Sequence, residues 1–123
     1  MMTWAHVPVH IAVPAPPKET YWFVHSQSSN LEAPIVVDTE AQLCLNPSKN
    51  LYPEGHRWYE VAEKWVGRPI LDYAQLLKGA TKCVMVDSSF FCLALTLGLT
   101  PEVWCRNGRS YKNVNAGLVE HMF

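Results

Sequence analysis

The stretch Ile70–Arg106, ILDYAQLLKGATKCVMVDSSFFCLALTLGLTPEVWCR, decides the fold. It predicts a helix, a buried strand, a second helix and a further strand. The first helix has Pro69 at its start, where a missing N–H has no partner to lose, and Gly79 at its end. Lys82–Val86 is a short apolar run of the kind found in parallel strands that are covered on both faces. The stretch therefore predicts the centre of a parallel sheet.

The turn Asp87-Ser88-Ser89 joins the buried strand to the second helix. Asp and Ser are preferred at helix N-caps, where a side-chain oxygen accepts a backbone N–H bond. A helix N-terminus also carries free N–H donors and partial positive charge, which suit an anion. In an open α/β sheet this turn lies at the carboxyl end of the strands, where ligands commonly bind. Two interpretations stay open: Asp87 or Ser88 only caps the helix, or the turn receives an anionic ligand.

The composition is that of an ordinary globular domain. The 123 residues are 49% apolar and 17% charged, which suits one domain with a core that needs no disulfides. The net charge of −1 disfavours nucleic acid or a charged membrane surface as a partner. No apolar run approaches the ~20 residues that span a bilayer, and residues 1–17 lack the basic start of a signal peptide. We therefore expect a cytoplasmic protein with neither a membrane nor a nucleic-acid partner.

The cysteines and histidines do not predict a metal site. The four cysteines form no C-x-x-C pair and show no spacing typical of zinc. His6 and His10 are separated by Pro8, so they do not share a helical face. Cys83 and Cys92 fall in the most apolar segments, where a free thiol behaves as a small hydrophobe. We expect reduced thiols, no metal and no resident cofactor.

The first half of the chain predicts an arm followed by strands. Residues 1–20 are expected to form an N-terminal arm or edge strand, because Pro8 interrupts an alternating apolar pattern. Tyr21–His25 is dense in aromatic and β-branched residues and predicts a strand. Further strands are expected at Pro34–Asp38 and Leu43–Leu45.

The second half adds a helix and one more strand around the central stretch. A short helix is predicted over Trp58–Trp65, whose two tryptophans share a face and are expected to pack in the core. Glu102–Cys105 predicts the last strand, and residues 111–123 are expected to be a tail with a helical turn at Ala116–Val119. The pattern as a whole predicts a three-layer, Rossmann-like α/β domain over residues 21–110, with a mainly parallel sheet of about five strands.

Four motifs occur in a fixed order along the chain. They are Y-W-F-V-H at Tyr21–His25 with its serine-rich loop, I-L-D-Y at Ile70–Tyr73, V-M-V-D-S-S-F at Val84–Phe90, and E-V-W at Glu102–Trp104 followed by Arg109. In this combination the chain resembles the C-terminal, donor-binding lobe of the GT-B class glycosyltransferases. More narrowly, it is similar to glycosyltransferase-like proteins of bacteria and phages. The resemblance covers roughly residues 21–109.

The resemblance implies a nucleotide-sugar or nucleoside diphosphate ligand at the carboxyl end of the sheet. By position, the D-S-S turn would meet the diphosphate or sugar, and the loop after the first strand would face it. The basic exit of the last strand would add positive charge. The implied ligand-binding residues are His25, Ser26, Ser28, Asp87, Ser88, Ser89, Arg106 and Arg109.

The chain also departs from that pattern. Similar proteins commonly read F-V-H-D-D followed by an arginine, whereas His25 is followed here by S-Q-S-S-N. The roughly 20 residues before Tyr21 are too few for an acceptor lobe. We therefore expect a free-standing binding lobe that is not catalytic alone and that works as a homodimer or with a separate partner chain. The alternative is a non-catalytic dimerising or partner-binding domain that has lost the ligand site, with Trp4, Trp58, Trp65 and the Val7–Val13 arm as candidate contacts.

A third hypothesis is an enzyme that acts by itself. Asp87-Ser88 is similar to the strand-to-nucleophile turn of serine hydrolases, although no glycine precedes Asp87. His25 is a candidate base for Ser88 if the two loops meet at the same sheet edge. The simpler interpretation is that His25 is a strand-end histidine bonded to a backbone carbonyl.

Overall fold

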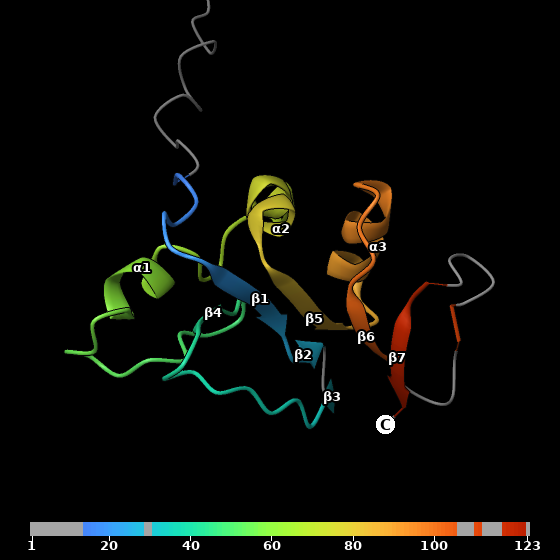
Figure 1. Ribbon diagram of the computed structural model, residues 1–123, viewed down its shortest axis with the longest axis horizontal. Coiled ribbons are helices and arrows are strands. Elements are labelled where there is room, and N and C mark those ends of the chain that lie inside the picture. Colours follow the sequence, from blue (N-terminus) through green and yellow to red (C-terminus); the bar gives the residue numbers. More distant parts are fainter. Residues whose placement is uncertain (1–13, 29–30, 106–109, 112–116, 123) are drawn as a thin grey trace, which may run out of the picture.

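The computed structural model describes residues 14–28, 31–105, 110–111 and 117–122, and Figure 1 shows their arrangement. Its centre is a five-stranded sheet in which every neighbouring pair of strands is parallel. The strands in spatial order are β4 (Leu43–Leu45), β1 (Tyr21–His25), β5 (Lys82–Val86), β6 (Glu102–Cys105) and β7 (Val119–Met122). The predicted Rossmann-like α/β domain with a parallel sheet of about five strands is confirmed. Most of the expected N-terminal arm lies outside the described residues.

The order of the strands creates a topological switch point between β1 and β5. The chain leaves β1 toward β4 on one side, then returns across β1 to β5 and continues through β6 to β7 on the other. Phe23 pairs with Cys83 and His25 with Met85, so β1 and β5 end at the same edge of the sheet. In sheets of this kind, the crevice outside the carboxyl ends of the strands at the switch point is where ligands bind.

The α-helices all lie on one side of the sheet. They are α1 (Tyr59–Glu63), α2 (Ala74–Gly79), which the 3-10 turn η3 (Ile70–Tyr73) precedes, and α3 (Ser89–Thr96). In Figure 1 they stand above the sheet, whereas β2 (Gln27–Ser28), β3 (Leu31–Glu32) and the chain that follows lie below it. Right-handed crossovers explain this, because the connections that run toward β7 and the one that runs toward β4 pass on opposite faces. The layer opposite the helices is therefore a non-helical crossover in the described chain.

The core lies between the sheet and the helices. Alternate strand residues face the helices, so that Phe23, Met85 and Val103 are fully buried beside Leu76 of α2 and Ala94 of α3. Aromatic rings extend this core, with Phe23 in contact with Tyr73 and Phe90. Trp65 is buried as predicted, while Trp58 is half-buried. None of the described helices has the length and apolarity needed to cross a bilayer.

Two predicted elements are wrong. Pro34–Asp38 is not a strand, and Val36 within it is 93% exposed. Pro34 lacks an N–H for a ladder, and both edges of β1 are already occupied by β4 and β5. The helical turn expected to end at Val119 is also wrong there, because Val119 begins β7, which pairs along β6.

The thiols differ in burial from the prediction at one position. Cys92 is exposed on α3, while Cys83 is half-buried and Cys44 and Cys105 are buried. An apolar run in a helix covers more than one face, so Cys92 falls on the solvent side. All four thiols are free.

Candidate functional site

Buried polar side chains gather at the carboxyl edge of the sheet. The described chain buries His25, Ser26, Asn46 and Asp87, each less than a tenth exposed. His25 ends β1 and Ser26 follows it, Asn46 follows β4, and Asp87 follows β5. With Ser88, the N-cap residue of α3, these residues form what we term the carboxyl-edge cluster. It lies at the switch point between β1 and β5.

His25 and Ser88 are the closest pair in this cluster. The Ser88 hydroxyl oxygen lies 3.1 Å from Nδ1 of His25. Burial lowers the pKa of His25 to about 4, and a hydrogen bond with the Gln27 backbone, which favours the protonated ring, offsets part of this effect. The imidazole is therefore neutral at pH 7. Its ring also packs on Phe90, with ring centroids 4.7 Å apart.

The N-terminus of α3 has no side-chain cap. Ser88 occupies the N-cap position, but no side chain there bonds to the helix backbone. Its hydroxyl instead contacts His25, and Asp87 accepts a hydrogen bond of 3.1 Å from the Tyr111 hydroxyl. The interpretation that Ser88 merely caps the helix is therefore wrong. The N–H groups of Ser89 and Phe90 have no acceptor among the described residues.

Asn46 holds the neighbouring part of the cluster in place. Its side-chain nitrogen donates to the Ser26 hydroxyl oxygen over 3.4 Å, and its side-chain oxygen accepts the Ser48 N–H over 2.8 Å. The backbone of Ser26 also accepts a bond from the Ala33 N–H. These bonds tie the end of β1 to the turn after β4.

The structure brings together five of the residues proposed from the sequence: His25, Ser26, Asp87, Ser88 and Ser89. Ser28 belongs to β2, and its side chain lies outside the described residues, as do Arg106 and Arg109. Asn46 and Tyr111 were missed. The signal for Asn46 was its position directly after a short strand, which matches the position of Asp87, whereas nothing in the weak pattern around Tyr111 pointed to a contact with Asp87.

No metal site accompanies the cluster in the described part of the chain, where no group of three or more His, Cys, Asp or Glu residues is placed to hold an ion. The chemistry available is that of hydrogen-bond donors. Hydroxyls, an amide and open helix N–H groups surround one carboxylate and one neutral imidazole. Such a set can hold an anion at the helix end and a hydroxyl-bearing group at the carboxylate.

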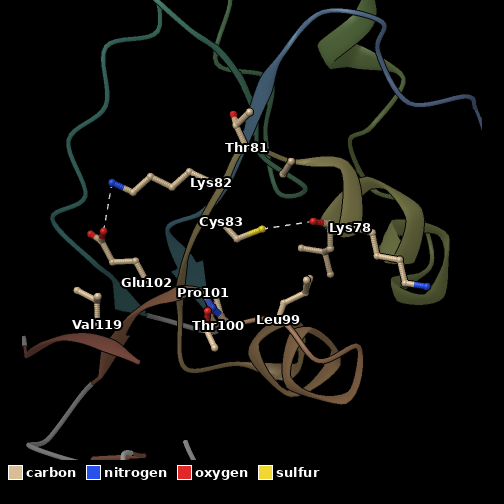
Figure 2. A pocket seen from close by; sticks show the side chains of 11 residues that line it. Lys78, Thr81, Lys82, Cys83, Leu99, Thr100, Pro101, Glu102 and Val119 are labelled. Atoms are coloured by element: carbon tan, nitrogen blue, oxygen red, sulfur yellow. Dashed lines mark hydrogen bonds and ion pairs between the residues drawn. The ribbon is translucent and has the colours of Figure 1, made fainter. Parts of the chain in front are cut away.

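A hollow of about 330 Å³ lies at the opposite, amino-terminal edge of the sheet. Figure 2 shows Cys83, Leu99 and Thr100 around it, with Lys82 reaching away to Glu102 over 3.2 Å. The Cys83 thiol contacts the Leu77 carbonyl oxygen at 3.7 Å, and burial raises the pKa of this thiol to about 11. The thiol is therefore protonated and unreactive at pH 7. The hollow and the carboxyl-edge cluster are separate places.

Comparison of the chain with protein-family models, with curated proteins and with solved structures gives no match.

Proposed function

We propose that the chain binds a nucleotide or nucleotide-sugar at the carboxyl-edge cluster, as a lobe of the donor-binding type that is not a glycosyltransferase by itself. The observation that carries the proposal is the position of the buried polar side chains. All four in the described residues meet where β1, β4 and β5 end, beside a helix N-terminus whose N–H groups are open. Burying polar groups costs free energy, so a cluster of them at a switch point favours a binding role.

The phosphate and the sugar of the proposed ligand suit different positions in the cluster, because the two positions differ in charge. A phosphate group suits the N-terminus of α3, where the N–H groups of Ser89 and Phe90 and the Ser89 hydroxyl are available as donors. The Asp87 carboxylate repels a phosphate and accepts hydrogen bonds from hydroxyl groups, so it suits a ribose or sugar. His25, being neutral, holds the Ser88 hydroxyl without adding charge. Arg106 and Arg109 remain proposed from the sequence as a source of positive charge and lie outside the described residues.

The proposal is tested by thermal unfolding of the full chain with nucleoside diphosphates and nucleotide-sugars, followed by calorimetric titration with any ligand that stabilises it. Binding to the native state alone raises stability by RT ln(1 + [L]/Kd), or about 2.7 kcal/mol at a hundred times Kd. The melting temperature should therefore keep rising with ligand concentration. If none of these ligands raises it, the proposal fails.

Two variants locate the phosphate. Ser89→Ala removes one donor and should weaken binding by about 1 kcal/mol, or roughly fivefold. Thr96→Ala is the matched control, because Thr96 is an exposed hydroxyl at the other end of α3 that bonds to the Cys92 carbonyl. Arg109→Ala should weaken binding and make it less dependent on salt. Equal affinity in the Ser89 and Thr96 variants would place the phosphate elsewhere.

A second candidate function is self-association or docking of a partner chain through β7. This strand ends the sheet, and Val119 and Met122 on it are each about half exposed. An edge strand with exposed apolar residues can pair with another chain. Light scattering would test this, since a stable dimer that Val119→Lys converts to a monomer would favour the interface, and a monomer at high concentration would exclude a homodimer through β7.

The cytoplasm is the compartment we propose for this role. All four thiols are free, and two of them, Cys83 and Cys92, are at least partly accessible. Such thiols persist in a reducing environment.

A further inference from the structure

The contact between Ser88 and His25 has the geometry of a nucleophile and its base. Their 3.1 Å separation falls within the hydrogen-bond reach of about 2.6–3.2 Å expected for such a pair. Ser88 lies on the turn from β5 to α3 and is partly exposed, whereas His25 is buried behind it and covered by Phe90. A ligand can therefore reach the hydroxyl from solvent while the imidazole stays shielded from water.

The ring of the base is held in place by its packing. His25 is 5% exposed, and its ring lies against Phe90 with the ring centroids 4.7 Å apart. The imidazole therefore has little room to turn away from the Ser88 hydroxyl. None of the ion pairs among the described residues involves His25.

Donors for a developing oxyanion are present beside the hydroxyl. The N–H of Ser89, the residue after Ser88, and the N–H of Phe90 have no acceptor in the described chain. In enzymes that carry a serine on a strand-to-helix turn, the N–H of the next residue stabilises the negative oxygen of the tetrahedral intermediate. A phosphate and this oxyanion have similar shape and charge, so both suit the same donors.

We propose that Ser88 is a nucleophile that accepts an acyl group from a small, activated ester or thioester, with His25 as the proton acceptor. The Ser88 oxygen bonds to the carbonyl carbon as its proton moves to Nδ1 of His25. The bond to the leaving alcohol or thiol then breaks, and that group leaves with the proton. Water cleaves the acyl-serine by the same two steps and restores both side chains. The inference goes beyond nucleotide binding, although it uses the same N–H groups.

The surroundings of the pair define the class of substrate. A neutral imidazole without a carboxylate partner is a weak base, so the carbonyl carbon must be strongly electrophilic, as in an aryl ester or a thioester. The Asp87 carboxylate, adjacent to Ser88 and bonded to Tyr111, disfavours an acyl chain with a negative charge. The substrate class is therefore an uncharged, short acyl group on a good leaving group.

The test uses the full chain with p-nitrophenyl acetate in a Cys92→Ser background, because Cys92 is an exposed thiol that the ester would also acylate. We expect release of p-nitrophenolate and an acetyl group that peptide mapping places on Ser88. Ser88→Ala should abolish that acetylation, and His25→Gln should slow it about 10²-fold. Thr96→Ala on the same helix should react like the parent. His25→Gln changes a buried side chain, so Ser88→Ala, a small change on a partly exposed side chain, is the decisive variant.

The pH profile separates this reaction from random acylation. Since the pKa of His25 is about 4, the rate of Ser88 acetylation should be constant from about pH 5 to 8. The acylation of lysines and thiols rises with pH over the same range. Pyrophosphate should compete with the ester for the N–H groups. An acetyl group found only on other residues, or an equal rate in Ser88→Ala, would overturn the inference. Acetylation of Ser88 without stabilisation by any nucleotide would instead reject nucleotide binding and leave this inference standing.

Discussion

The two edges of the sheet use polar residues in different ways. At the carboxyl edge, His25, Ser26, Asn46 and Asp87 are buried, and each has a hydrogen-bond partner. At the amino edge a hollow of about 330 Å³ is lined by the charged pair Lys82 and Glu102, whose side chains are 42% and 22% exposed. The hollow is thus not where the buried polar side chains lie. In a parallel sheet the helix N-termini and strand ends converge at the carboxyl edge, so burial of matched polar groups indicates the site better than volume does.

The largest expected effect on stability comes from a substitution that removes packing under the carboxyl edge. Phe23 is fully buried and touches Phe90, the ring that covers His25. Phe23→Ala should lower the free energy of unfolding by about 3–5 kcal/mol, because it leaves a cavity that cannot collapse. Leu77→Ala, at the amino edge, should cost less, since Leu77 already lines the hollow. Urea denaturation of both variants measures the difference, and an equal loss would show that the two edges are packed alike.

The second-largest expected effect is a pH dependence of stability that arises from His25 at the carboxyl edge. The folded protein holds the pKa of His25 at about 4, against 6.5 in an unfolded chain, because burial disfavours the charged ring. Between these values the unfolded chain binds a proton that the native state refuses. Stability is therefore complete above pH 6.5 and falls by about 3 kcal/mol as the pH drops to 4.

The control for this dependence is His25→Gln, which cannot titrate. Its stability should change less between pH 7 and pH 4 than that of the parent chain, as measured by urea denaturation at each pH. Equal slopes in the two proteins would mean that the imidazole is protonated in the native state, contrary to its burial.

The third effect tests the close packing at the amino edge. A Cβ on Gly79 would lie 2.7 Å from the hydroxyl oxygen of Tyr21, which donates to the Leu76 carbonyl over 2.6 Å. Gly79→Ala should therefore cost about 1–3 kcal/mol. In a Tyr21→Phe background the same change should cost less, because the clashing oxygen is absent. Additive losses in the double mutant would show that the two residues do not interact.

The smallest effect concerns the charges at the amino edge. Lys82 pairs with Glu102 and lies over the Trp22 ring, but its side chain is 42% exposed. Lys82→Ala should cost only about 0.2–1 kcal/mol, and less at high salt, because exposed ion pairs are screened. Thermal unfolding at low and high salt measures this, and a loss above 2 kcal/mol would make this edge as structurally important as the other.

Secondary-structure elements were predicted correctly where the sequence signal acts on its own stretch of backbone. Tyr21–His25, Lys82–Val86 and the helix end at Gly79 were predicted well, because β-branched residues, apolar runs and glycine act on their own backbone. Pro34–Asp38 was mispredicted, since an apolar run becomes a strand only where a sheet edge is free. The strand at Val119–Met122 was missed because its short, half-polar sequence gains its ladder from β6.

The candidate site divides in the same way. The sequence pointed to His25 and to the D-S-S turn, since each follows a strand and carries polar groups. It did not decide whether Ser88 caps α3 or bonds elsewhere, because both uses need the same hydroxyl. The choice depends on His25, which is 63 residues distant along the chain.

By itself, the sequence determined the class of fold, four of the five strands of the sheet, and the polar turn after the central strand. These features depend on backbone propensity and on the periodicity of apolar residues, which neighbours in the chain dictate. Only the tertiary structure decided which strand ends meet, which face the helices cover and which partner each buried polar group takes. These outcomes depend on strand order and crossover handedness, and they are settled when distant segments compete for the same edge, core volume and hydrogen bonds.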